Sequence, residues 1–244
     1  MAKRILTIFA HPDDAETMAG GTLLKWARDG HQITLCLITD GDKGTADPTD
    51  TPEAVVARRR VEQAGAAARL GAAVVGLGYE DGLLQATLDL RRDLVRVMRR
   101  VRPQVVVAGD PTVWFRHGTY INHPDHRAAA QAAVEALYPA VKKHGIFPEL
   151  LAEGLEPHVV EEVWLGPTDQ PDTWIDISDV FEEKIALICE HASQFPPGPT
   201  RTAFTRMARE VGQERGLALA ESFRTLRLSS STVRSIAGDR EPGR

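Results

Sequence analysis

The sequence predicts an α/β fold in which helices cover both faces of a doubly wound, mostly parallel sheet. Two patterns predict this fold: short apolar runs alternate with helical patterns, and the order strand then helix occurs four times in succession. A length of 244 residues is sufficient for one large domain with a substantial core. We therefore expect residues 1-228 to form a single domain, followed by a flexible C-terminal tail at 229-244 that is rich in Ser, Arg and Gly.

Four apolar runs in the first half of the chain predict the strands of the parallel sheet. Each run is only a few residues long, as is typical of strands that are buried on both faces. The predicted strands cover residues 5-10, 32-39, 73-78 and 104-109.

Helical patterns follow each of these strands. They cover about residues 15-29, 53-70, 87-101 and 125-143. Gly30 and Gly71 are expected to end the first two helices, and the third should close before Pro103.

Beyond residue 150 the alternation is less regular. We expect further strands at 159-165 and 174-178, and a helix at 179-193. A proline-rich segment at 195-199 predicts a rigid loop, and a last helical pattern covers about 201-221.

Composition narrows the class of protein. Hydrophobic residues make up 43% of the chain and charged residues 26%, which is typical of a soluble globular protein. No apolar run approaches the roughly 20 residues of a membrane span, so we expect no membrane partner. The formal charge of -5 argues against nucleic acid, because phosphate backbones are bound by concentrated positive charge.

Cysteine usage and the N-terminus favour a cytoplasmic location. Only Cys36 and Cys189 are present, so neither a disulfide framework nor a thiolate metal site is indicated. The first residues resemble the start of a secretion signal, but no small-residue cleavage site follows them, and we interpret 5-10 as the first strand.

Two His-Pro-Asp clusters lie beyond strands that should be neighbours. His11-Pro12-Asp13-Asp14 follows the first strand directly, and His123-Pro124-Asp125-His126 follows the fourth. In the common strand order 3-2-1-4-5 these two strands lie side by side where the winding reverses, and ligands bind beyond their carboxyl ends. We therefore expect the two clusters to meet.

Together the clusters could form the metal site of a hydrolase. A catalytic zinc ion usually has three His or carboxylate ligands and an open position for water, and His11, Asp14 and His126 supply such a set. One Zn²⁺ per chain would lower the pKa of a bound water toward about 7.

The remaining polar residues of the clusters could carry the proton transfers. Asp13 could act as the general base, and His123 could stabilise the oxyanion or protonate the leaving amine. Asp125 could hold an imidazole in orientation.

Each cluster also has alternative interpretations. Asp13 or Asp14 could cap the following helix, and His-Pro pairs occur in turns. Two His and one carboxylate could instead bind the iron of a non-haem oxygenase. Gly20-Gly21 could belong to a non-catalytic Rossmann-type nucleotide-binding module, although the spacing Gly-x-Gly-x-x-Gly is absent after the first strand.

The clusters and several other segments resemble the signatures of the PIG-L/LmbE-like zinc N-deacetylases. The two main signatures are matched by Ala10-His11-Pro12-Asp13-Asp14-Ala15-Glu16 with Gly20-Gly21-Thr22, and by Asn122-His123-Pro124-Asp125-His126-Arg127. Further similarities, in the order of the family, are Thr39-Asp40-Gly41, Arg59 with Glu62, Tyr79-Glu80-Asp81-Gly82 and His191-Ala192-Ser193-Gln194. The commonest form of the first signature has Glu directly after the second Asp, whereas Ala15 intervenes here.

The resemblance implies a Rossmann-like fold and hydrolysis of an N-acetyl group, usually from an N-acetylglucosamine-type sugar. It implies zinc ligation by His11, Asp14 and His126, a base role for Asp13 and transition-state stabilisation by His123. It also implies substrate contacts at Arg59, Asp81 and His191. An amidase that acts on a thiol-sugar conjugate is an alternative, and similar proteins often form homo-oligomers, trimers or hexamers.

Overall fold

A seven-stranded sheet runs through the computed structural model, which describes residues 1–116 and 118–228. Its strands are β1 (Arg4–Phe9), β2 (Gln32–Thr39), β3 (Ala73–Tyr79), β4 (Val105–Ala108), β7 (Glu162–Leu165), β8 (Thr173–Asp176) and β9 (Ala220–Arg227). Their order in the sheet is β3-β2-β1-β4-β7-β9-β8. The first five strands in this order are parallel to one another, whereas β9 pairs antiparallel with both β7 and β8. The predicted doubly wound, mostly parallel sheet is confirmed.

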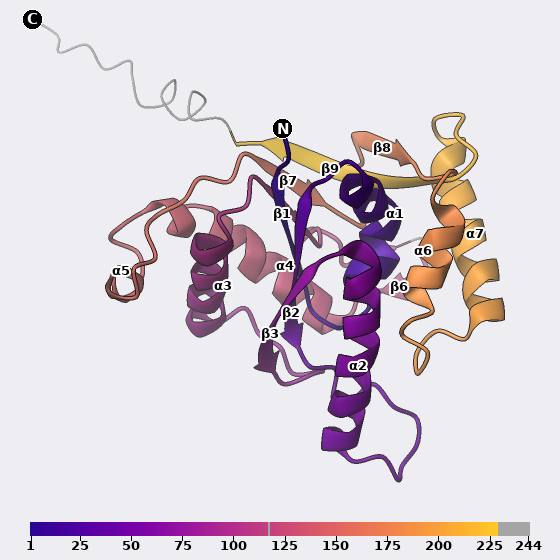
Figure 1. Cartoon of the computed structure of the whole chain (residues 1–244), viewed down its shortest axis with the longest axis horizontal. Helices are drawn as coiled ribbons and strands as arrows, with labels where there is room; N and C mark the ends of the chain where they lie inside the picture. Colours follow the sequence, from indigo (N-terminus) through magenta and orange to yellow (C-terminus); the bar gives the residue numbers. More distant parts are fainter. Residues whose placement is uncertain (117, 229–244) are drawn as a thin grey trace, which may run out of the picture.

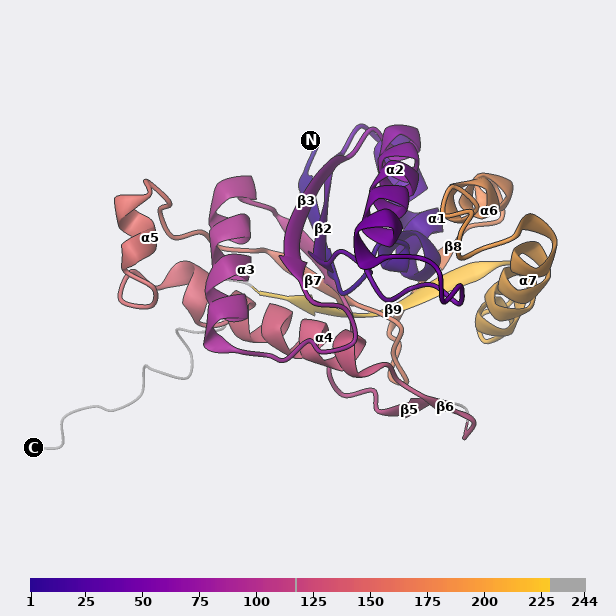
Figure 2. The same ribbon diagram turned by 90° about the horizontal axis from the view of Figure 1, so that it is seen from below.

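Helices cover both faces of this sheet (Figures 1 and 2). They are α1 (Asp14–Arg28), α2 (Pro52–Leu70), α3 (Leu88–Val101), α4 (Pro124–Leu137), the 3₁₀ turn η1 (Ala140–Lys142), α5 (Glu149–Ala152), α6 (Phe181–Ile188) and α7 (Pro197–Gln213). A two-stranded hairpin, β5 (Phe115–Arg116) and β6 (Tyr120–Ile121), leads from β4 to α4. Within the described ranges, none of the helices is long and apolar enough to cross a membrane.

The central strand β1 is buried on both faces, which explains its continuous apolar sequence. Leu6 and Ile8 pack in the cluster formed with α3 and α4, while Ile5 and Phe9 pack in the cluster formed with α1, α2 and α6. Because side chains alternate along a strand, one short run contributes to two cores. β1 is thereby held in the middle of the sheet. The residues that follow it emerge where the parallel strands have their carboxyl ends.

The C-terminal part of the fold differs from the prediction. The helix expected at 201-221 begins earlier, at Pro197, and ends at Gln213, and the last of those residues belong to the strand β9. A proline is tolerated in the first turn of a helix, where its missing N–H would be unpaired anyway. Gly216 adopts the left-handed φ of 68° after the helix has ended. The predicted tail at 229-244 lies outside the described residues.

The fourth helix is also shorter than expected. We predicted 125-143, but α4 ends at Leu137 and Pro139 follows two residues later. Proline has no N–H for the helical ladder, and its ring collides with the carbonyl of the preceding turn. The chain therefore continues as the short turn η1.

A buried ion pair attaches β9 to the helical layer. Glu221 accepts hydrogen bonds from the backbone N–H groups of Gly21 and Thr22 and pairs with Lys184 Nζ at 2.7 Å. A side chain at Gly21 would lie 2.6 Å from Ile177, so this glycine permits close packing of α1. The Gly20-Gly21 pair that we considered for nucleotide binding therefore lies at a packing contact.

Replacing Glu221 with Gln should lower the free energy of unfolding by about 3–5 kcal/mol, because Lys184 would remain buried without its counter-charge. Chemical denaturation of both proteins measures the difference. Glu183→Gln is the matched control, since Glu183 pairs with Arg28 on the surface and its loss should cost at most about 1 kcal/mol. Equal stability of the Glu221 variant and the native chain would contradict this account of β9.

Candidate metal centre and active site

The two His-Pro-Asp clusters meet at the carboxyl ends of β1 and β4. These strands pair in parallel, and His11 lies two residues beyond β1. Pro124 begins α4, so His126 lies in the first turn of that helix. His11 Nδ1 lies 3.2 Å from His126 Nε2, although 115 residues separate them in the sequence. The predicted meeting of the clusters is therefore observed.

Three ligand atoms converge at this point. His11 Nδ1 lies 3.4 Å from Asp14 Oδ2, and His126 Nε2 lies 3.0 Å from Asp14 Oδ1. Ligands at zinc's usual bond lengths are separated by about 3.3 Å along the edges of a tetrahedron. The spacing between the two ring nitrogens, and the spacing from each of them to one of the two Asp14 oxygens, are compatible with such an arrangement, and these residues could hold a metal ion.

A second group, His11, His123 and Asp125, is also compact enough for a metal. Both oxygens of Asp125, however, already accept backbone hydrogen bonds: Oδ2 from Gly82 N–H at 2.6 Å and Oδ1 from Leu84 N–H at 3.2 Å. Asp125 Oδ2 also lies 3.3 Å from His11 Nε2. This geometry suits a carboxylate that orients the ring of His11 better than one that binds a metal itself.

The surroundings of His11 favour a positive charge. Burial alone would lower the pKa of His11, but hydrogen bonds to Asp14 and Asp81 outweigh burial and raise this pKa to about 10. Burial likewise would raise the pKa of Asp14, but the charge of His126 and the hydrogen bond to His11 hold it well below its usual range. A cation placed among these groups would be stabilised by the same carboxylates.

Asp13 belongs to neither of the two groups of possible metal ligands. Its φ of 93° lies in the left-handed region, which non-glycine residues rarely adopt. Asp13 occupies the N-cap position of α1, but its side chain makes no capping hydrogen bond, so the carboxylate does not serve as a cap. Burial and the nearby charge of Asp14 raise the pKa of Asp13 to about 7, while Arg59 opposes that shift. A carboxylate with a pKa near neutrality suits a general base.

Arg59 holds Asp13 in this position. Its guanidinium donates to Asp13 Oδ2 and, at 2.5 Å, to the carbonyl of Pro12. The side chain is buried, and a Cβ at either Gly41 or Gly44 would lie within 2.6 Å of it. Two glycines of the loop after β2 thus leave the space that Arg59 fills.

His123 is the N-cap of α4, and its Nδ1 accepts a hydrogen bond from the N–H of Asp125 at 3.2 Å. Burial and the neighbouring His11 and His126 lower the pKa of His123, which favours the neutral ring. Because the accepting Nδ1 carries no proton, the proton of the neutral ring is on Nε2. The His123 ring packs edge-on against His11, with 5.0 Å between ring centroids. His123 therefore presents a hydrogen-bond donor beside the three ligand atoms.

The three residues for which the resemblance implies substrate contacts are all buried. Arg59 contacts Asp13, and Asp81 Oδ1 lies 3.1 Å from His11 Nε2. His191 is fully buried, with Nε2 at 3.7 Å from Glu16 Oε2. Each side chain thus packs against a residue of the two clusters or of the helix that follows them. These contacts suit support of the site, and the substrate contacts that the resemblance implies for the three residues stay a prediction.

Other residues of the site were not anticipated. Gln63 donates to Glu16 at 2.8 Å, and the backbone of Gly82 and Leu84 binds Asp125. Gln63 lies one helical turn after Arg59, so both face the same side of α2. That spacing could have identified Gln63 from the sequence. The N–H groups of Gly82 and Leu84 could not be identified in this way, because every residue except proline has one.

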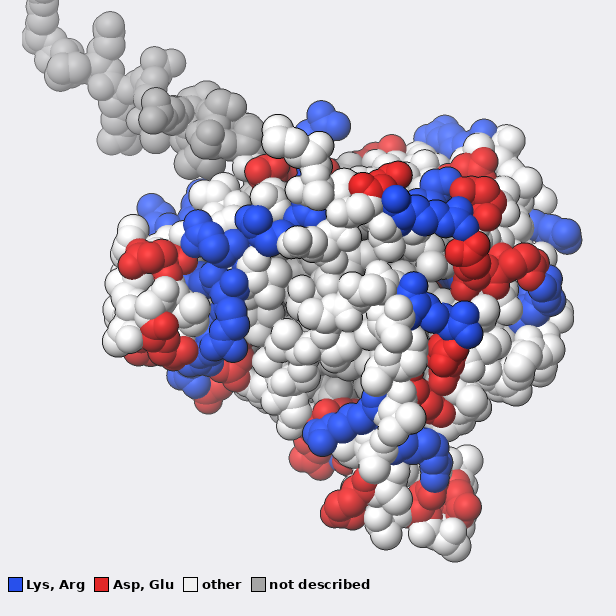
Figure 3. Space-filling model, viewed as in Figure 1, with Lys and Arg blue, Asp and Glu red and all other residues white. Residues whose placement is uncertain are grey.

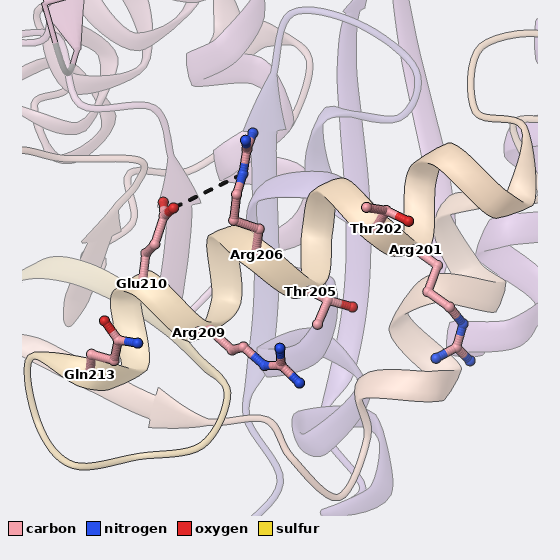
Figure 4. A pocket seen from close by; sticks show the side chains of 7 residues that line it. All are labelled: Arg201, Thr202, Thr205, Arg206, Arg209, Glu210 and Gln213. Carbon is pink, nitrogen blue, oxygen red and sulfur yellow. Dashed lines mark ion pairs between the residues drawn. The ribbon is translucent and has the colours of Figure 1, made fainter.

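Two surface hollows lie outside the cluster of ligand atoms. One of about 410 Å³ is lined by Pro12, Arg59 and Gln63 together with β2 and β3 residues. Another, of about 660 Å³, lies along α7 (Figure 4), where Arg206 pairs with Glu210. The second hollow includes none of the predicted site residues. On the face drawn in Figure 3, positive and negative side chains are interspersed.

Comparison with known proteins agrees with this geometry. The sequence profile of PIG-L, described as GlcNAc-PI de-N-acetylase, matches residues 6–137, which include every residue of both clusters. The chain belongs to the PIG-L family. Members of the family with similar sequences are named as deacetylases, hydrolases of carbon–nitrogen bonds.

Relatives in the PIG-L family cover most of the chain. It is 36% identical to a diacetylchitobiose deacetylase of Thermococcus kodakarensis over 80% of this chain and 71% of that protein. A 1D-myo-inositol 2-acetamido-2-deoxy-alpha-D-glucopyranoside deacetylase of Rhodococcus erythropolis is 27% identical, over 83% of this chain and 85% of the relative. The structure of N,N'-diacetylchitobiose deacetylase from Pyrococcus horikoshii superposes with a TM-score of 0.86 at 31% identity, covering 93% of this chain and 84% of that one.

Membership of the PIG-L family confirms the predicted resemblance and the class of the enzyme. The oxygenase and nucleotide-binding interpretations have no counterpart among these relatives. His123 and His126, three residues apart in one signature, are also distinguished by the contacts that each makes.

Proposed function

We propose that this protein is a zinc-dependent deacetylase that removes the N-acetyl group from an N-acetylglucosamine-type sugar. The main support is the convergence of three ligand atoms beside a carboxylate, Asp13, that belongs to neither metal group. The deacetylases among its relatives act on acetylated sugars, which supports the same substrate class.

His11, Asp14 and His126 would hold the ion in this proposal. A zinc ion there supplies Lewis acidity, which polarises the acetyl carbonyl and makes water a stronger nucleophile. Asp125 and Asp81 would keep the ring of His11 oriented through its other nitrogen.

The protein's own residues would carry the proton and charge movements. Asp13 accepts a proton from the water whose oxygen forms the new bond to the acetyl carbon. The Nε2–H of His123 donates to the carbonyl oxygen as negative charge develops on it. The carbon–nitrogen bond then breaks, the proton passes to the departing amine, and acetate and the free amino sugar remain.

Acetate release tests this proposal directly. Purified protein, depleted of metal and then supplied with zinc, should release acetate from N,N'-diacetylchitobiose or from an N-acetylglucosaminyl-inositol, the sugars on which its relatives are named. Activity that is lost on chelation and restored by zinc would support the metal assignment. Absence of acetate from every N-acetylglucosaminide offered would refute the proposed substrate class, and a thiol-sugar conjugate would be the next substrate to assay.

Arg59→Lys should lower kcat by about 10-fold to 100-fold and leave metal content unchanged. Lysine keeps the charge but cannot reproduce the guanidinium fork that holds both Asp13 and the carbonyl of Pro12. Arg60→Lys is the matched control, because Arg60 is exposed and pairs with Asp40. Equal kcat values for the two variants would remove Arg59 from the positioning of Asp13.

A further inference from the structure

Large apolar side chains are exposed on the β5–β6 hairpin, close in sequence to His123. Phe115 is 64% exposed and Ile121 70% exposed, while Trp114 and Tyr120 on the same hairpin are about half exposed. Figure 2 shows the two strands projecting beyond the helical layers. Exposed apolar patches of this kind often mark binding sites in a folded protein.

The pairing of the strands separates these side chains onto two faces. Phe115 lies opposite Ile121, and Arg116 lies opposite Tyr120. Residues directly opposite each other in an antiparallel pair share a face, and successive residues alternate. Phe115 and Ile121 therefore share one face, which we call the Phe115–Ile121 face, and Tyr120 lies on the other.

The other face and the base of the hairpin are attached to α4. The Arg127 guanidinium stacks over the Trp114 ring at 4.1 Å and donates to the carbonyl of Asn122. The side-chain amide of Asn122 donates to the carbonyl of Val113 at 2.8 Å, and its backbone N–H to that of Trp114 at 2.9 Å. These contacts hold the hairpin in register with the helix that carries His126 and leave the Phe115–Ile121 face uncovered.

The Phe115–Ile121 face continues toward the active site. Ile121 ends β6, and His123, the N-cap of α4, follows it by two residues. The spacing between them is roughly 7 Å along the chain. For a substrate whose acetamido group lies at His123, Ile121 and its cross-strand partner Phe115 are exposed apolar side chains within reach of its next group.

We infer that Phe115 and Ile121 form a subsite for the sugar ring that is attached to the reacting N-acetylglucosamine unit. This inference rests on the proposed function. A pyranose ring presents a face of C–H groups, which carry slight positive charge and pack on the electron-rich face of an aromatic ring and on aliphatic carbon. The subsite would select glycosides with a second ring over the monosaccharide.

Binding measurements with and without the second ring test the subsite. Calorimetry in an Asp13→Asn background, where turnover is blocked, would compare N,N'-diacetylchitobiose with N-acetylglucosamine. Adding Phe115→Ala and Ile121→Ala together should weaken disaccharide binding about 10-fold and monosaccharide binding less than about 2-fold. Tyr120→Ala is the matched control on the opposite face and should change neither.

Three results would overturn the subsite. These are a parent protein that binds both sugars equally, a double variant that weakens both equally, and a double variant with unchanged affinities whose assembly dissociates in light scattering. The last result would assign the Phe115–Ile121 face to a contact between copies of this chain. Failure of the wild-type protein to release acetate would refute the proposed function instead, and the ratio of the two affinities would still decide the subsite.

Discussion

Replacing Asp13 with Asn should lower kcat by about 100-fold or more while leaving metal content unchanged. The amide cannot accept the proton of the attacking water, and general-base catalysis typically contributes this much or more. The converging ligand atoms belong to His11, Asp14 and His126, so the substitution leaves them in place. Steady-state kinetics and elemental analysis of the same preparation give both quantities.

A matched control separates the base from a general effect of charge. Asp179→Asn removes a carboxylate that is exposed and paired with Lys25, and should retain native activity. Native turnover in the Asp13 variant would mean that another group takes the proton.

Replacing His126 with Ala should remove most of the bound metal and with it the activity. Its Nε2 lies within 3.2 Å of both His11 Nδ1 and Asp14 Oδ1, and loss of one ligand in three sharply weakens a metal site. Metal content by elemental analysis, measured after dialysis against a fixed zinc concentration, is the deciding quantity.

His123→Ala is the companion variant, because both histidines lie in one signature. It should keep its metal, lower kcat by about 100-fold and change KM little, as expected for a donor that acts only in the transition state. Metal loss from this variant, with metal retained after replacement of His126, would assign the ion to the alternative group of His11, His123 and Asp125.

The sequence was sufficient to predict that His11 and His126 meet. Both follow apolar runs, and the alternation of strands and helices places those runs side by side at the reversal of winding. The roles of Arg59 and Asp81 could not be predicted in this way. Their contacts depend on how α2 and the loop after β3 approach the clusters, which no local pattern encodes.

The C-terminal strands of the sheet were predicted less well than its centre. β9 carries several charged and polar residues, so its sequence lacks the apolar run that identified β1. Its buried Glu221 is compatible with the sheet because Lys184 and two helical N–H groups satisfy the carboxylate. These partners come from segments that are distant in the sequence, so the local pattern of residues in β9 does not reveal them.

The placement of the ligand atoms on two segments 115 residues apart links metal concentration to the stability of the fold. An ion at this position would join the loop after β1 to the start of α4, and the unfolded chain offers no such preformed site. By mass action, free metal at 100 times its dissociation constant would add about 2.7 kcal/mol to the free energy of unfolding. The thermal midpoint of this protein should therefore rise steadily with the logarithm of free metal concentration, so that the ion serves as a reversible cross-link as well as a reagent.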